Sequence, residues 1–481
     1  MIDKKKIKKI SDYLWEIPKD YRQGMNVPAR IYATEKMLDE VFRDQSLEQL
    51  VNVTHLHGIE GTVMAMPDAH EGYGFPIGGV AAMRISDGVI SPGGVGYDIN
   101  CGMRLLKSEH NTKELKPYLE KLGHEMNRQV PSGVGRGGRL KLNKQDMDKV
   151  LKEGVPWLVK QGYGEKEDPQ YLESYGVLPN ADPDVVSNQA KQRGSDQLGT
   201  MGAGNHFVEI DRVSQIFDEE VARAFGLFED QIVVLIHTGS RGLGHQVCTD
   251  FLRVMANAMP KYKITIPDRQ LACVPFSSPE GKDYFNAMAA AANFAWGNRQ
   301  MISWQVRQAW KNILGGEAGN LSTLYDVAHN IAKIEEHEID GKKMKLIVHR
   351  KGATRAFGPG NPELAPEYKK VGQPVLIPGS MGTASYVLVG TEQAMKESFG
   401  SSCHGAGRRM SRHAAIRQVQ GHELRKELEQ MGIIIECASN RGLAEEAPLA
   451  YKDVHDVVDV VARAGIARKV VCLKPVAVIK G

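Results

Sequence analysis

An aspartate and a cysteine, Asp98 and Cys101, lie three residues apart in the glycine-rich segment GGVGYDINCG at positions 93–102. Because glycine lets a backbone turn sharply, both side chains can point at one centre. A carboxylate and a thiolate can hold a metal ion together, and a bound cation deprotonates a thiol whose own pKa is near ~8.5. An isolated pattern of this kind is nonetheless more often a buried cysteine beside a turn aspartate.

Three histidines at the ends of expected elements strengthen the metal interpretation. His206 lies in GAGNHF, His237 ends the apolar stretch QIVVLIH, and His329 follows LSTLYDVA. Each histidine alone is more often a hydrogen-bonded core residue, but with the Asp–Cys pair they form a candidate metal set. The soft thiol favours zinc and the carboxylate favours a harder ion, so the residues leave the metal open.

Two further groups are alternative metal pairs. The first is His55-Leu56-His57, which in a strand would put both rings on one face, and the second is Asp68-Ala69-His70-Glu71. For His70 we favour another role, the ordering of the loop over 67–79.

A possible nucleophile, His404, lies in SSCHGAGRR at positions 401–409. Neutral imidazole is a competent nucleophile at pH 7. The flanking glycines leave room for a phosphate, and the neighbouring arginines can neutralise it. A phosphate-binding loop in which His404 only donates a hydrogen bond explains the segment equally well.

The common nucleotide motifs give no alternative. The chain has no Walker A sequence and no Lys-x-Asp-Gly element, and its one GxGxxG pattern, at 133–138, does not follow an evident strand. Arg136 and Arg139 in that segment fit a phosphate contact or a solvated loop. Further cations near glycine-rich loops favour phosphate binding, namely Arg350, Lys351, Arg355 and Arg412.

The elements that must position these residues are mixed. The 50 glycines cluster in short runs beside expected strands and helices, which indicates a site assembled from loops on a rigid scaffold. We expect strands at 231–237 and 345–350, and a hairpin over 331–350 with its turn at Asp340-Gly341. Expected helices cover 113–128, 145–161, 245–259, 283–313, 421–431 and 452–464. Their irregular order predicts an α/β (mixed α+β) domain and not a doubly wound sheet.

Composition narrows the class of protein. The chain has 481 residues and a net charge of +3, with 42% hydrophobic and 25% charged residues, as in globular proteins. No run of about 20 apolar residues predicts a membrane span, and the basic start lacks the features of a secretory signal. Six cysteines without a CxxC pair predict a reducing, cytoplasmic setting. We expect one domain over 1–481, with 113–190 as a peripheral insertion.

From about residue 50 to its end the chain resembles the RtcB family. The resemblance rests on PDAHEGYGFPIGG, GGVGYDINCGMRLL, LGTMGAGNHFVEI, HTGSRGLGHQV, VHRKGATRAF, PVLIPGSMGTASYVLVG, SSCHGAGRRMSR and EEAPLAYKDVHDVV with KPVAVIKG. It implies a single compact domain of mixed β-sheets surrounded by helices. It also implies a monomeric RNA ligase that uses GTP and two Mn²⁺ ions and is often assisted by a small protein called archease. Such enzymes join a 3′-phosphate or 2′,3′-cyclic phosphate to a 5′-hydroxyl in tRNA splicing and RNA repair.

The resemblance also implies roles for residues. Cys101 would bridge two metal ions, with Asp98 and His206 completing one, and His237 and His329 the other. His404 would carry the guanylate. The implied guanylate pocket comprises Asn205, His206, Phe207, Val208, Glu209, His329, Asn330, Pro378, Gly379, Ser380, Met381, Ser385, His404, Gly405, Ala406, Gly407 and Lys480. A carboxylate such as Glu209 suits guanine, whose N1–H and N2–H₂ groups are donors.

Two other functions stay open at this point. A metal-dependent phosphoesterase could use the same Asp, Cys and His residues to hydrolyse cyclic phosphates without any guanylate. A non-catalytic RNA-binding subunit is the second alternative. The His404 loop and Lys480 favour the ligase over the phosphoesterase, and the full set of candidate metal ligands disfavours the non-catalytic subunit.

Overall fold

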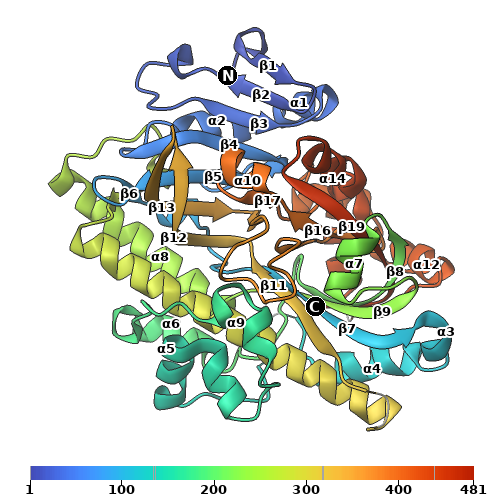
Figure 1. The fold of residues 1–481 in the computed structure, drawn as a ribbon. Helices are drawn as coiled ribbons and strands as arrows, with labels where there is room; N and C mark the ends of the chain where they lie inside the picture. Colours follow the sequence, from blue (N-terminus) through green and yellow to red (C-terminus); the bar gives the residue numbers. More distant parts are fainter. Residues whose placement is uncertain (1, 134, 136, 317–318, 438) are drawn as a thin grey trace.

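A computed structural model describes residues 2–133, 135, 137–316, 319–437 and 439–481, and within these ranges two large sheets form the scaffold (Figure 1). The first has seven strands in the order β1 (Lys8–Ser11), β2 (Leu14–Ile17), β3 (Ala29–Tyr32), β4 (Ile59–His70), β5 (Ile77–Arg84), β13 (Lys342–Lys351) and β12 (Asn330–Ile339). The second has eight, in the order β11 (Ser322–Ala328), β7 (Gly102–Asn111), β9 (Gln231–Thr238), β8 (Phe207–Ile216), β19 (Ala467–Lys480), β16 (Ser385–Gly390) and β15 (Pro374–Ile377), with β18 (Ile434–Cys437) beside β19.

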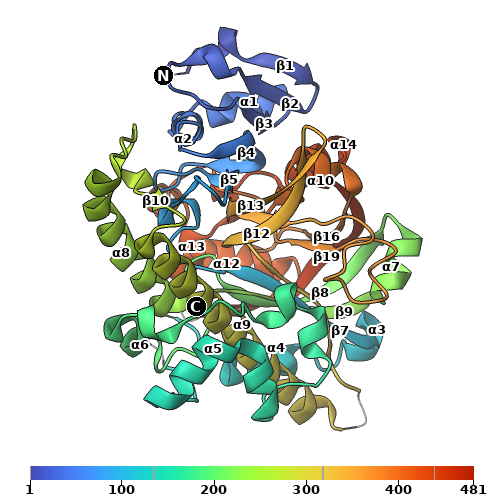
Figure 2. The ribbon, with the colours of Figure 1, turned by 60° about the vertical axis from the view of Figure 1, so that its left-hand side comes forward.

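Most neighbouring strands are antiparallel, but β3–β4 and β18–β19 are parallel. Two small sheets pair β6 (Val89–Ile90) with β10 (Val274–Pro275), and β14 (Ala353–Arg355) with β17 (Ser401–Cys403). Helices surround the sheets, as both ribbon views show (Figures 1 and 2). The prediction of a mixed α/β fold is therefore confirmed.

The second sheet brings distant parts of the sequence to one end. Its central strand β9 is buried along its whole length, as the apolar stretch predicts, and β7 and β8 flank it. Across these strands Met103 pairs with His237, His237 pairs with Phe207, and Phe207 pairs with Lys480. On the other side of β7, Gly102 pairs with Ala328. This register places the residues that follow or precede these pairs in the sequence at the same end of the sheet.

The predicted hairpin forms as β12 and β13. Its turn residues Asp340 and Gly341 have φ angles of 48° and 74°, the positive values that a two-residue hairpin turn demands. Aspartate tolerates this region better than most residues, and glycine adopts it freely.

Four of the six predicted helices form continuous helices: α8 (Arg241–Ala258), α9 (Pro279–Leu314), α12 (Gly421–Gln430) and α14 (Val454–Arg463). The helix predicted over 145–161 forms as α5 (Lys144–Lys160). The helix predicted over 113–128 is instead split into α3 (Thr112–Leu115) and α4 (Leu119–Gln129). Pro117 lies between them, and proline cannot donate the backbone hydrogen bond that a continuous helix needs. α5 is itself interrupted at Gly154, which has φ 57° and ψ −139°.

The long helix α9 lies between α5 and α8 and contacts both. Its middle is buried on every side, and the small residues Ala289–Ala292 allow this close packing. Asp168, within the segment 113–190, forms a buried ion pair with Arg307 of α9 at 2.7 Å. That this segment is a peripheral insertion stays a prediction. No helix in the described ranges combines the length and the apolar character that a membrane crossing requires.

Candidate active site

A cavity of about 330 Å³ opens where loops of both large sheets meet. Its wall is formed by the glycine-rich segments that the sequence singled out, and these contribute backbone as well as side chains. From the candidate residues it is lined by Asp98, Cys101, Asn205, Phe207, Glu209, His237, His329, Asn330, Pro378, Gly379, Ser380, Met381, His404, Gly405, Ala406, Gly407 and Lys480. The strand register thus gathers groups that are more than 300 residues apart in sequence.

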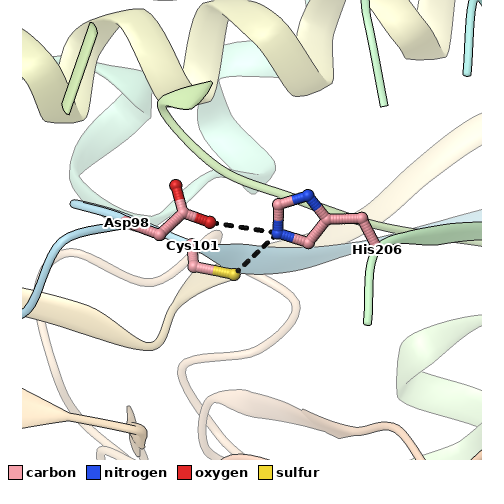
Figure 3. A group of neighbouring side chains, drawn as sticks. All are labelled: Asp98, Cys101 and His206. Atoms are coloured by element: carbon pink, nitrogen blue, oxygen red, sulfur yellow. Dashed lines mark hydrogen bonds and ion pairs between the residues drawn. The ribbon is translucent and has the colours of Figure 1, made fainter. Parts of the chain in front are cut away.

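Asp98, Cys101 and His206 form a tight cluster beside this cavity (Figure 3). Nε2 of His206 is 3.0 Å from Oδ2 of Asp98 and 3.5 Å from Sγ of Cys101. On the other side of the sulfur, Nε2 of His237 is 3.3 Å away. The Cys101 sulfur therefore lies between two imidazole nitrogens, which is the arrangement that a bridging thiolate needs.

Backbone carbonyls fix the tautomers of two of these histidines. Nδ1 of His206 is 3.0 Å from the oxygen of Met201, and Nδ1 of His237 is 3.2 Å from the oxygen of Asn205. Because a carbonyl oxygen only accepts, each Nδ1 donates its proton, and each Nε2 is directed at Cys101. For His237 this leaves the lone pair on Nε2. Nε2 of His206 also faces the Asp98 carboxylate, an acceptor whose place a bound cation would take. Both rings are set to act as ligands.

His329 completes the set from the end of β11. Its Nδ1 is 2.9 Å from the hydroxyl of Thr354, while its buried Nε2 has no hydrogen-bond partner among the described residues. Buried polar atoms are normally satisfied. Its ring lies 5.5 Å from that of His237 and 5.3 Å from that of His404, measured between centroids. An unsatisfied imidazole nitrogen whose ring neighbours two further imidazoles fits a metal ligand.

A fully buried arginine, Arg299, stabilises the loop that carries Asp98 and Cys101. Arg299 of α9 donates to the carbonyl oxygens of Asn100, at 2.7 Å, and Thr238, at 2.8 Å, and forms an ion pair with Asp326. Asn100 has a positive φ of 52°, a conformation that such contacts must stabilise. Arg299 therefore ties the Asp98–Cys101 turn to the end of β9.

Asp98 is oriented by the turn after β9. The backbone N–H of Ser240 donates to Oδ1 of Asp98 at 3.0 Å, which leaves Oδ2 directed at His206. A Cβ at Gly239 would lie 2.3 Å from this carboxylate, so only glycine permits the approach. Burial and the charge of Asp98 raise the pKa of the Cys101 thiol well above its ordinary value. A nearby cation would oppose this shift and favour the thiolate.

His404 is oriented by a carboxylate, Asp68, at the end of β4. Its Nδ1 is 2.6 Å from Oδ2 of Asp68, and the same oxygen accepts the backbone N–H groups of His404, at 2.8 Å, and Gly405, at 3.2 Å. Burial opposes ionisation of Asp68, but the interactions with His404 outweigh it and lower the pKa of the carboxyl group. An ionised Asp68 accepts the hydrogen bond from Nδ1–H and so holds the proton on Nδ1, which leaves the lone pair of His404 on Nε2.

The sequence analysis missed this role of Asp68, which it grouped with His70 as an alternative metal pair. His70 lines the cavity and its Nδ1 donates to the Asp68 carbonyl oxygen at 2.9 Å, within the 67–79 segment. The contact between Asp68 and His404 spans 336 residues and has no local signal. Gly407 packs closely against the backbone of Asp68, since a Cβ there would lie 2.2 Å from the Asp68 carbonyl oxygen.

Substitution Asp68→Asn should slow any reaction that needs a nucleophilic His404. The neutral amide lacks the charge that stabilises Nδ1–H. In the orientation that donates to Nδ1 it also places the proton on Nε2 and leaves the backbone N–H groups of His404 and Gly405 without their acceptor. In a comparable Asp–His arrangement this change costs roughly 10⁴-fold, and we expect a loss of 10²- to 10⁴-fold in the rate of GTP labelling. The rate is measured with labelled GTP under single-turnover conditions, with the melting temperature as the control for folding. An unchanged rate in a folded variant would show that Asp68 does not set the tautomer.

Three residues of the implied guanylate pocket do not line the cavity. His206 lies behind it, against Cys101. Val208 is fully buried in the hydrophobic core of the second sheet. The hydroxyl of Ser385 accepts the backbone N–H of Gly379 at 3.1 Å, so it supports the loop that does line the cavity.

Two buried carboxyl groups lie on one strand, β8: Glu209, which lines the cavity, and Asp211, which does not. Burial, followed by the charge of Asp211, raises the pKa of Glu209 well above its ordinary value, while Lys480 opposes the rise. Burial raises the pKa of Asp211 to about 7, and neither of its oxygens has a hydrogen-bond partner among the described residues. Glu209 lines the cavity, so a ligand with hydrogen-bond donors would satisfy it.

The prediction that Arg350 and Arg355 contact phosphate is wrong. Both side chains are buried outside the cavity. Arg350 pairs with Glu335 and donates to the hydroxyl of Ser401, and Arg355 pairs with Glu363. Arg350 thereby ties β13 to β17, the strand that leads into His404.

The other predicted cations differ in their placement. Lys351 and Arg412 line the cavity, together with Arg408 from the histidine loop. Arg139 lies outside it and donates to the carbonyl oxygen of Arg128 at 3.2 Å. Arg136 lies outside the described residues, as does one other position of the GxGxxG segment.

The alternative metal pair at His55 and His57 is also wrong. These residues lie in a turn after α2 (Ser46–Val53) and not in a strand. Nδ1 of His55 is 3.0 Å from the carbonyl oxygen of Val51, and His57 is 72% exposed near Asp87. Neither contributes to the cavity.

Comparison with known proteins agrees with the site. A family model described as tRNA-splicing ligase RtcB matches residues 49–481. The tRNA-splicing ligase RtcB of Archaeoglobus fulgidus is 54% identical over 477 residues, which cover 99% of each chain, and that of Thermococcus kodakarensis gives the same values. The corresponding protein of Methanococcus maripaludis is 49% identical over 480 residues, which cover 99% of this chain and all of that one.

A mixed α/β scaffold whose cavity joins thiol, carboxylate and imidazole groups to a separately oriented histidine is the framework of an enzyme, and the relatives give its class as a ligase. The chain belongs to the RtcB family.

Proposed function

We propose that the protein is a GTP-dependent RNA ligase that joins 3′-phosphate or 2′,3′-cyclic phosphate ends to 5′-hydroxyl ends through a guanylate on His404. The observation that carries this proposal is the free Nε2 of His404, which Asp68 orients and which shares a cavity with Cys101. A hydrolase would need no such nucleophile beside its metal-binding groups.

The reaction would proceed in three transfers, after water has opened a cyclic end to a 3′-phosphate and a 2′-hydroxyl. First, Nε2 of His404 attacks the α-phosphorus of GTP, a phosphorus–nitrogen bond forms, and pyrophosphate leaves. An oxygen of the RNA 3′-phosphate then attacks that phosphorus, which releases His404 and leaves a guanylate on the RNA. Finally the 5′-hydroxyl attacks the RNA 3′-phosphorus and GMP leaves.

The metal-binding residues would serve these transfers by charge. Asp98, Cys101 and three histidines, His206, His237 and His329, would hold two Mn²⁺ ions, which would neutralise phosphate charge during transfer. Asp68 keeps the proton of His404 on Nδ1, so that Nε2 can attack in the first step and leave in the second. Gly405 and Gly407 leave space for the phosphate beside the ring.

The names of the relatives support tRNA exon halves as substrates. Repair of other broken RNAs would use the same chemistry on the same ends. Archease as a partner also belongs to this proposal.

Base choice would depend on Glu209, which lines the cavity on the same strand as Phe207. A site built to hydrogen-bond one base edge can reject an analogue by roughly 10⁴-fold, because its buried polar groups are left unpaired. Glu209→Ala should therefore lower the preference for GTP over ATP by about 100-fold or more. The preference is measured as the ratio of labelling rates for the two nucleotides.

Glu209→Gln is the matched control for size, because it keeps one acceptor oxygen and should retain part of the preference. If ATP is as poor a substrate for Glu209→Ala as for the unmodified protein, Glu209 does not select the base.

A metal-dependent phosphoesterase is the second candidate, and the Asp98–Cys101–His206 cluster by itself favours it equally. The purified protein is incubated with an RNA bearing a cyclic phosphate and an RNA bearing a 5′-hydroxyl, with and without GTP. A ligase gives a joined product only with GTP. Hydrolysis of the cyclic phosphate without joining, independent of GTP, would identify the phosphoesterase.

A further inference from the structure

Two tyrosines that have no part in the proposed GTP site form part of the cavity wall. Tyr73 lies in the loop between β4 and β5, and Tyr97 immediately precedes Asp98. Their ring centroids are 5.6 Å apart with an interplanar angle of 68°. His245 of α8 stacks on Tyr97, with centroids 4.8 Å apart and an interplanar angle of 27°. The three rings make a continuous aromatic wall.

This wall is accessible although it borders a buried cluster. Tyr73 is 36% exposed, an unusual value for a large aromatic residue at the rim of a cavity, and Tyr97 is partly exposed. Tyrosine and histidine rings with a free face are the groups on which proteins stack unpaired bases.

The loop that carries Tyr73 is held rigidly. Gln49 makes two hydrogen bonds with the backbone of Gly72, at 2.7 and 3.0 Å. The side chain of Gln270 accepts the N–H of Gly74 at 2.8 Å. Lys351 donates to the carbonyl oxygens of Tyr73, at 2.8 Å, and Phe75, at 2.9 Å. Three side chains from distant segments thus fix a short loop whose tip presents an exposed ring.

The cost of this arrangement indicates a ligand. Lys351 is 5% exposed, and burial lowers its pKa to about 7. Its amino group nevertheless binds two backbone carbonyl oxygens of this loop. The hydrophobic effect alone would bury Tyr73 instead of holding it open. A rigid aromatic surface loses little conformational entropy when a planar partner stacks on it.

The position of the wall relative to His404 and to the Asp98–Cys101 loop indicates which part of a ligand it contacts. Gly352 follows Lys351, and a Cβ there would lie 3.1 Å from the ring of His404. A Cβ at Gly96 would lie 3.5 Å from the side chain of Lys351. Through Lys351 and Gly352 the wall is therefore connected to His404, and through Tyr97 to the loop of Asp98 and Cys101.

Positive charge accompanies the rings. Arg408 and Arg412 line the same cavity as the two tyrosines. Aromatic rings with nearby cations are typical of sites for single-stranded nucleic acid.

We propose that Tyr73 and Tyr97, backed by His245, form a stacking wall for the terminal base of an RNA strand whose end reaches His404. The inference rests on the proposed RNA-joining function, because that function requires an unpaired RNA end in this cavity. The wall contacts a base of any identity, since every base has a π face, so it contributes affinity and alignment but little sequence preference.

The test uses short single-stranded RNAs with 2-aminopurine, whose fluorescence falls when it stacks. One RNA carries the probe at a 3′-phosphorylated end, a second at a 5′-hydroxyl end, and a third in the interior. Mg²⁺ replaces Mn²⁺, because Mn²⁺ itself quenches fluorescence. We expect binding to quench one terminal probe severalfold more than the interior probe, and the quenched probe identifies the end that the wall binds.

Variants then assign the quenching to the two rings. Tyr73→Leu and Tyr97→Leu should lose it, and the Kd for RNA should rise by about 5- to 100-fold, the loss expected when a base loses its aromatic partner. Tyr73→Phe and Tyr97→Phe keep the ring and should retain the quenching. Melting temperatures control for folding, and if a leucine variant unfolds, the unmodified protein and the phenylalanine variants decide.

Absence of quenching at both ends in the unmodified protein would overturn the proposal, as would leucine variants that bind and quench normally. Labelling of the unmodified protein with GTP is measured in parallel. Quenching without labelling would refute the guanylate on His404 and leave the stacking wall standing. Labelling without quenching would refute the stacking wall and leave the guanylate on His404 standing.

Discussion

Replacement of His404 by alanine should abolish covalent labelling by GTP and the joining of a 3′-phosphate RNA, by about 10⁴-fold or more. The variant loses the nucleophile but keeps Asp98, Cys101 and the three histidines near them. It should therefore bind metal normally and still seal an RNA that already carries a guanylate on its 3′-phosphate. That last step uses only the 5′-hydroxyl as nucleophile and GMP as leaving group. Labelling, metal content and sealing of the activated RNA are measured on the same preparation.

The matched control is His422→Ala, at an exposed histidine of α12 that is not part of the cavity lining. It should label and join like the unmodified protein. Full GTP labelling of His404→Ala would remove His404 as the nucleophile. Loss of sealing of the activated RNA, with metal content intact, would show that His404 acts beyond the first two transfers.

Replacement of Cys101 by serine should have an equally large effect through the metal ions. The sulfur lies 3.3 Å from Nε2 of His237 and 3.5 Å from Nε2 of His206, so its loss affects both candidate ion positions at once. A serine hydroxyl remains protonated and is a weaker ligand for a cation. We expect fewer bound Mn²⁺ ions per chain and a loss of joining of about 1,000-fold or more, because metal ions supply several kcal/mol of charge stabilisation.

Cys273→Ser provides the matched control, since Cys273 is also a buried thiol but lies outside the cavity lining. Metal content per folded chain is measured by elemental analysis after gel filtration. The bridging role is contradicted if Cys101→Ser binds as many ions, with the same affinity, as the unmodified protein.

The parts of the fold with strong local signals could be predicted from the sequence. The apolar run at 231–237 forms the buried strand β9, and Asp340-Gly341 forms the hairpin turn. Short N-terminal strands such as β1 and β2 carry no comparable periodicity and were not predicted. Their pairing depends on neighbours that only the folded chain supplies.

The site could be predicted in composition but not in detail. Residue types and glycine-rich surroundings indicated Cys101 and His404, because metal ligands and nucleophiles need close backbone approach. Charge alone gave the wrong role for Arg350, because an arginine in a loop and an arginine in a buried ion pair look alike in sequence. The role of Asp68 could not be predicted, since its contact with His404 links β4 of one sheet to a loop after β17.

The guanylate on a histidine is the central claim, and the unmodified protein tests it directly. The purified chain is incubated with Mn²⁺ and GTP labelled in either the α- or the γ-phosphate, and is then denatured and separated by electrophoresis. Label from the α-phosphate should stay on the chain, and label from the γ-phosphate should leave with pyrophosphate. The bound label should be lost in acid and kept in alkali, as a phosphorus–nitrogen bond requires. A chain that retains no α-label, or an adduct that is stable in acid and lost in alkali, would contradict the account.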